Sequence, residues 1–152
     1  WLAQFNSRIY AVPPMPTRFS ARFGESIELL GYSVERSDGT LTYRLVWRAR
    51  EALAQDYRLF VQIAPRDAPA HPLAQASNRP LFWPFPEARW ERGEIVDDPI
   101  MLSLDGLPPG EYITLVSWRE NGAPGATLPA YDAAGTPQPD AWVSLPTTIV
   151  VP

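Results

Sequence analysis

The stretch TLTYRLVWRA, residues 40–49, decides the fold class, because its apolar and polar side chains alternate. One face of an extended chain would carry the apolar side chains of Leu41, Tyr43, Leu45 and Trp47. The opposite face would carry the polar side chains of Thr42, Arg44 and Arg48. This period of two is that of a half-buried β-strand, and one solvated face favours antiparallel pairing.

Other segments alternate in the same way or form short apolar runs between turn signals. They are IELLGYSV (27–34), YRLFVQIAP (57–65), GEIVDDPIMLSL (93–104), EYITLVSW (111–118), ATLPAYD (126–132) and TTIVVP (147–152), with a further candidate near HPLAQAS (71–77). Pro99 interrupts one of them and suits an edge strand, because proline cannot donate to a ladder. About seven or eight short strands predict an antiparallel β-sandwich, immunoglobulin- or fibronectin-like, with a small closed barrel as the alternative.

Composition favours one domain without affinity for nucleic acid. The chain has 152 residues, 45% of them hydrophobic, and a net charge of -4. An acidic chain of this kind has no general attraction to a phosphate backbone. We expect an extended, proline-rich lead-in over residues 1–24 and a single β-sandwich domain over residues 25–152. No apolar run is long enough to cross a bilayer, so the chain is expected to be a soluble part of a longer protein.

The sequence offers little material for catalysis or metal binding. It has no cysteine and a single histidine, His71, which no nucleophile turn such as G-x-S-x-G accompanies. Adjacent strand residues such as Asp97 and Asp98 point to opposite faces and do not easily share a cation. There is no glycine-rich phosphate loop before a helix. We therefore predict no catalytic residue, no cofactor and no metal for this chain.

The segment RPLFWPFPEARW, residues 79–90, is the strongest candidate for ligand contact. Its rings at Phe82, Trp83 and Phe85 are separated by prolines that prevent continuous ladder pairing. Exposed rings of this kind can stack on sugars, lipids or a partner protein. Polar groups that could accompany them in a ligand site are Asn78, Arg79, Glu87 and Arg89. Capping of the core by the same rings is the alternative, and the sequence leaves both interpretations open.

Five segments together resemble a known domain. They are FGESIELLGYSV, TLTYRLVWRA, DYRLFVQIAP, ARWERGEIVDDPIMLSL and LPPGEYITLVSW, which cover about residues 22–120. They resemble a soluble β-sandwich domain found toward the C-terminus of bacterial multispanning membrane proteins. Those proteins are similar to dolichyl-phosphate-mannose-type protein mannosyltransferases and to aminoarabinose transferases.

The resemblance implies a position outside the cytoplasm but carries over no catalytic residue, because the acids of that family belong to its membrane-embedded part. The matched residues look structural: Phe23, Gly24, Gly31, Tyr32, Trp90, Gly93, Gly110 and Tyr112. The chain departs from the family at LFWPFPEA, residues 81–88, which is bulkier and more apolar than the usual approach to the turn at residues 89–94.

Three functions follow from these observations. The first is a noncatalytic, extracytoplasmic accessory domain of a membrane glycosyltransferase-like protein, which recognises a glycan, a lipid-linked sugar or an acceptor. The second is a structural or protein-interaction module that docks on the membrane-embedded domain of the same parent chain. The third, an enzyme, would need convergent carboxylates or His71 in a hydrogen-bonded relay.

Overall fold

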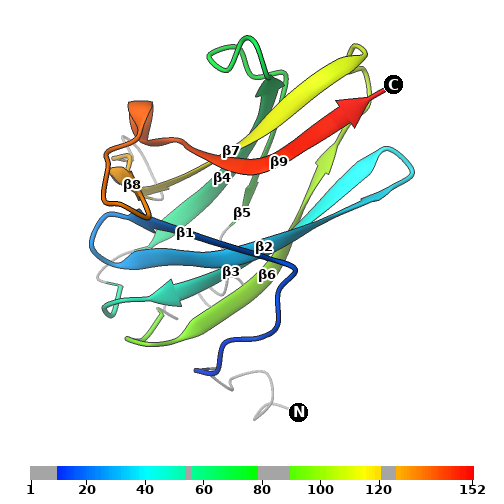
Figure 1. Cartoon of the computed structure of the whole chain (residues 1–152). Coiled ribbons are helices and arrows are strands. Elements are labelled where there is room, and N and C mark those ends of the chain that lie inside the picture. Colours follow the sequence, from blue (N-terminus) through cyan, green and yellow to red (C-terminus); the bar gives the residue numbers. More distant parts are fainter. Residues whose placement is uncertain (1–9, 54–55, 79–89, 121–125) are drawn as a thin grey trace.

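Two antiparallel sheets pack face to face in the computed structural model, which describes residues 10–53, 56–78, 90–120 and 126–152 (Figure 1). The first sheet has the order β6-β3-β2-β1-β8, with bounds Ile95–Ser103, Thr40–Ala49, Ile27–Ser37, Thr17–Phe23 and Ala130–Asp132. The second has the order β5-β4-β7-β9, with bounds Ala74–Asn78, Tyr57–Pro65, Gly110–Glu120 and Val143–Val151. A single 3-10 turn, η1 (Pro139–Ala141), is the one helical element of these ranges. The predicted antiparallel β-sandwich is confirmed.

Every segment expected to be a strand forms one, and β1 is additional. The prolines of the lead-in end at Pro16, and from Thr17 the side chains alternate between half-buried and exposed until Ala21 and Phe23 reach the core. β1 pairs with β2 on one side and with β8 on the other. The segment expected as a lead-in over residues 1–24 therefore enters the first sheet at Thr17.

Residues 10–16 lie along the outer face of the first sheet. Tyr10 Oη donates a hydrogen bond of 2.7 Å to Glu91 Oε2, which anchors one end of this stretch. Met15 lies against Gly31 of β2 so closely that a Cβ there would collide with its sulfur and lie 2.5 Å from the Thr17 carbonyl oxygen. The absence of a side chain at Gly31 therefore permits this close approach.

The chain crosses between the two sheets in the order of an immunoglobulin-like sandwich. With β2 counted as the first strand, the second strand pairs with the fifth (β3 with β6) and the third with the sixth (β4 with β7). β5 pairs with β4 at the edge of the second sheet rather than with β6. Pro99 lies in β6, which is an edge strand as its proline predicts.

Three tryptophans fill the centre of the core. Trp47 of β3 and Trp118 of β7 come from opposite sheets and stack edge to face, with ring centroids 5.1 Å apart. Trp90, which precedes the turn into β6, packs on Trp118 at 5.5 Å. All three are at most 1% exposed. The inward position of Trp47, which the alternation of residues 40–49 predicts, is confirmed.

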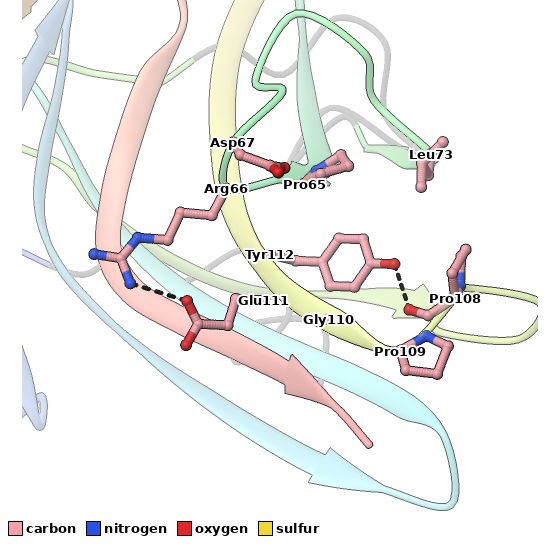
Figure 2. A pocket seen from close by; sticks show the side chains of 9 residues that line it. All are labelled: Pro65, Arg66, Asp67, Leu73, Pro108, Pro109, Gly110, Glu111 and Tyr112. Carbon is pink, nitrogen blue, oxygen red and sulfur yellow. Dashed lines mark hydrogen bonds and ion pairs between the residues drawn. The ribbon is translucent and has the colours of Figure 1, made fainter.

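Two hydrogen bonds of β7 residues stand where immunoglobulin domains have conserved features. Tyr112 Oη donates to the Pro108 carbonyl, 2.5 Å away, as in the tyrosine corner of those domains (Figure 2). That corner tyrosine lies two residues before the second cysteine of their inter-sheet disulfide. In this chain the position of that cysteine is occupied by Thr114, whose Oγ1 lies 2.7 Å from Tyr43 Oη of β3. A buried hydrogen bond thus links the two sheets in a chain without cysteine.

Candidate functional site

The site predicted around the 79–90 segment lies mostly outside the described residues. This applies to Arg79, Phe82, Trp83, Phe85, Glu87 and Arg89. Asn78 is described: it is the half-buried last residue of β5. The role of this loop in ligand contact therefore stays a prediction.

The histidine and the carboxylates considered for catalysis or metal binding lie in an exposed turn or form hydrogen bonds within the chain. His71 lies in an exposed turn between β4 and β5. Asp97 accepts a hydrogen bond of 2.7 Å from Arg44 Nη2, and buried Glu94 accepts one of 2.9 Å from the Glu91 amide. Over the described ranges, no group of three or more histidine or carboxylate side chains could hold a metal ion. In the same ranges no helix is long and apolar enough to span a membrane.

A first hollow lies at the tyrosine corner, with a volume of about 680 Å³ (Figure 2). We call it the corner hollow. Its main polar groups bind one another: Tyr112 donates to Pro108, and Arg66 Nη1 lies 3.1 Å from Glu111 Oε2. These contacts leave few groups for a ligand, so the corner hollow is best explained as a consequence of the fold.

A second hollow lies on the outward face of the second sheet, with a volume of about 600 Å³. We call it the outer-face hollow. Its floor consists of strand residues Gln62, Ile113, Leu115, Arg119 and Ser144. Its rim consists of Pro69, Ala70 and Pro72 from the loop after β4 and of Gln138, Pro139, Asp140 and Trp142 around η1. Both rim segments, green and orange in Figure 1, lie on the side of the second sheet away from the first.

Strand alternation and an irregular pairing explain why this face is hollowed. Tyr112, Thr114, Val116 and Trp118 face the core, so Ile113, Leu115 and Arg119 of β7 face outward. The pairing of β7 with β9 shifts register between Ile113 and Leu115, where extra residues of β9 leave the regular ladder. The sheet is therefore covered unevenly at this point: Ile113 of the floor stays partly exposed, whereas Leu115 is buried.

The rim at η1 carries backbone strain. Asp140 and Ala141 have positive φ angles of 53° and 61°, a region that residues with a side chain seldom occupy. Such strain clusters at ligand-binding sites, where surrounding structure holds it in place. The turn also positions Trp142 at the start of β9 with its side chain partly exposed at the hollow.

The polar groups of the outer-face hollow include both donors and acceptors. Gln62 Nε2 donates to Gln75, and Gln138 Nε2 donates to the Thr136 carbonyl, so both glutamine side chains of the lining are held by hydrogen bonds. Among the described residues, Asp140 is the one carboxylate of the lining. The guanidinium of Arg119 adds donors of fixed geometry. This arrangement suits a ligand with many hydroxyl groups.

Sequence reasoning missed this site, although Trp142 offered a signal. Its neighbours Pro139 and Asp140 interrupt any strand, so Trp142 stands at the edge of an ordered element rather than inside one. The remaining lining residues come from distant segments, and only the pairing of β4, β7 and β9 brings them together.

The fold defines a β-sandwich domain with a mixed polar and apolar hollow on one sheet face. No protein-family model matches the sequence. No curated protein matches it significantly.

Proposed function

We propose that the chain is a noncatalytic, extracytoplasmic accessory domain of a membrane glycosyltransferase-like protein, and that it recognises carbohydrate in the outer-face hollow. The observation that carries this proposal is the position of Trp142 beside Gln62, Gln138, Asp140 and Arg119 in one hollow. Ligand sites typically enclose about 300–1,000 Å³ with mainly apolar walls and a few polar groups. The volume of about 600 Å³ falls within that range.

The chemistry of a sugar matches these residues. A pyranose ring has an apolar face of C–H groups, which can stack on an indole such as that of Trp142. Its hydroxyl groups both donate and accept hydrogen bonds, as amide, carboxylate and guanidinium side chains require. Ile113 and Leu115 of the floor would exclude water from the stacked face. The hollow thus offers complementary contacts for both parts of the ligand.

The lining favours binding over catalysis. Hydrolysis of a glycosidic bond ordinarily uses two carboxyl groups placed across the scissile bond. The described lining supplies only Asp140, and no histidine is part of it. A ligand would therefore be held in this hollow without a pair of groups to act as acid and base.

The association with a membrane glycosyltransferase-like parent rests on the resemblance of residues 22–120. Docking on the membrane-embedded part of that parent through Phe82, Trp83 and Phe85 is the alternative function. The two functions predict different ligands and different binding residues.

Titration of the native chain with a panel of bacterial cell-surface glycans and polyprenyl-phosphate-sugar analogues, followed by calorimetry and tryptophan fluorescence, tests this proposal. Trp142→Ala removes the ring at the hollow, and Trp83→Ala is the matched variant for the aromatic loop. We expect saturable binding that Trp142→Ala abolishes and Trp83→Ala retains, with both variants folded by circular dichroism. Loss with Trp83→Ala alone would transfer the site to the loop, and no binding to any member of the panel would refute carbohydrate recognition.

A further inference from the structure

We propose that the outer-face hollow prefers anionic sugars, with the carboxylate or phosphate of the sugar bound by Arg119. This inference rests on the proposed carbohydrate function and names the class of sugar. It starts from the surroundings of one guanidinium group on β7.

Arg119 is held in place without an anionic partner. Its guanidinium carbon lies 5.0 Å from the centre of the Phe60 ring of β4, a cation–π distance. Its Nε is buried and has no hydrogen-bond partner among the described residues. The ion pairs found in that part of the chain join other arginines, namely Arg44, Arg48 and Arg66, to carboxylates. A positioned guanidinium group therefore lines the hollow without a carboxylate partner among the described residues.

A second guanidinium lies beside Arg119 on the same sheet face but is directed away from the hollow. Arg58 of β4 is the direct cross-strand partner of Arg119, and both side chains point to the outer face. Like charges placed directly opposite one another on a sheet are destabilising. Arg58 Nη1 donates to Ser77 Oγ at 3.0 Å, so Arg58 is directed toward β5, whereas Arg119 lines the hollow. This direction separates the two groups, and Arg119 is the arginine that faces the hollow.

Asp140 limits where the anion can lie. It forms no ion pair with Arg119 in the described structure, and it stands exposed on the rim at η1. A carboxylate there can accept hydrogen bonds from sugar hydroxyl groups but repels an oxyanion. The ligand orientation that satisfies both residues has the oxyanion at Arg119 and hydroxyl groups at Asp140, with the ring stacked on Trp142.

The planar guanidinium of Arg119 is suited to binding an oxyanion. Its fork of N–H groups can bind a carboxylate or a phosphate with two parallel hydrogen bonds, which are shorter and stronger than those between neutral groups. Ile113 and Leu115, the apolar residues of the floor, lower solvent screening near the contact. A neutral sugar would keep the ring stacking and lose the charged contact.

Calorimetric titration of the native chain with glucose, glucuronate and glucose 1-phosphate at low salt tests the inference. We expect at least one anionic sugar to bind about tenfold tighter than glucose or better, because charge-assisted hydrogen bonds are roughly twice as strong as neutral ones. Arg119→Gln should reduce this ratio to near one, and Arg58→Gln, which leaves the lining intact, should retain most of it. A higher affinity for glucuronate identifies a carboxylate ligand, and the opposite order identifies a phosphate.

Salt dependence provides a readout that needs no variant. Raising the salt concentration should weaken binding of the anionic sugars and leave glucose unaffected, since mobile ions screen charge pairs. Equal affinity for glucose and both anionic sugars would overturn the anionic preference but leave carbohydrate recognition standing. Failure of all three sugars to bind would also overturn it, and the glycan panel described above would then decide the proposed function separately.

Discussion

Removal of the hydroxyl group of Tyr43 should destabilise the sandwich far more than its small size suggests. Tyr43 is fully buried, and its Oη lies 2.7 Å from Thr114 Oγ1, which is also buried, on the opposite sheet. Tyr43→Phe leaves the threonine hydroxyl without its side-chain partner in an apolar core. The cost of such an orphaned group is about 1–3 kcal/mol.

The expected change in melting temperature follows from the size of the domain. For a chain of this length, 1 kcal/mol shifts Tm by roughly 2–4 °C. A loss of about 2 kcal/mol therefore predicts a decrease of roughly 4–8 °C for Tyr43→Phe. Tyr10→Phe is the matched control, because Tyr10 also donates one hydrogen bond but is half exposed. Its effect should stay within about 0.5 kcal/mol.

A double-mutant cycle separates the hydrogen bond from packing. Thr114→Val keeps the shape of the side chain and removes the same bond from the other end. Tyr43→Phe combined with Thr114→Val should cost much less than the sum of the single changes, because neither polar group is then left alone. Denaturant unfolding of the four proteins measures this coupling. Strict additivity would refute the reasoning that the two hydroxyl groups stabilise the sandwich as a pair.

Three further perturbations test other parts of the fold. Burial raises the pKa of Tyr43 to about 12, although its hydrogen bond acts in the opposite direction. The unfolded phenol loses its proton near pH 10, so the free energy of unfolding should fall by up to about 3 kcal/mol as pH rises from 10 to 12. Tyr43→Phe should flatten this part of the pH profile of unfolding. An identical slope in both proteins would contradict a raised pKa of Tyr43. Gly31→Ala should lower the unfolding free energy by about 1–3 kcal/mol, because its methyl group would lie 2.5 Å from the Thr17 carbonyl oxygen. An unchanged Tm would show that Met15 and Thr17 do not pack closely on Gly31. Tyr112→Phe, which removes the hydrogen bond to Pro108, should cost about 1 kcal/mol in chemical denaturation without altering the fold by circular dichroism, and no measurable cost would refute a stabilising tyrosine corner.

The fold could be predicted because the core residues of each strand alternate with outward-facing residues along the sequence. Trp47 and Trp118 stand at inward positions of strands whose period of two is visible in the sequence, and both are buried. β1 was not expected because three prolines precede it and its own pattern is short. Its position depends on pairing with β2 and β8, which is a property of the whole sheet.

The outer-face hollow could not be predicted for the same physical reason. Arg119 and Trp142 belong to different strands, and their proximity to Gln62 arises from sheet pairing and from the register shift between β7 and β9. The strain at Asp140 likewise depends on how the chain returns to the second sheet. Composition drew attention to the rings of residues 82–85 instead, because clustering along the sequence is visible without a structure.

The most direct test of carbohydrate recognition in the outer-face hollow is a two-dimensional ¹H–¹⁵N NMR titration of the native chain with glucuronate and with the tightest-binding member of the glycan panel. Binding in this hollow should place the largest shifts on the Trp142 indole, the Gln62 side-chain amide and the backbone amides of residues 113–119. Shifts confined to residues 79–90 or to the corner hollow, or no shifts at saturating ligand, would contradict it.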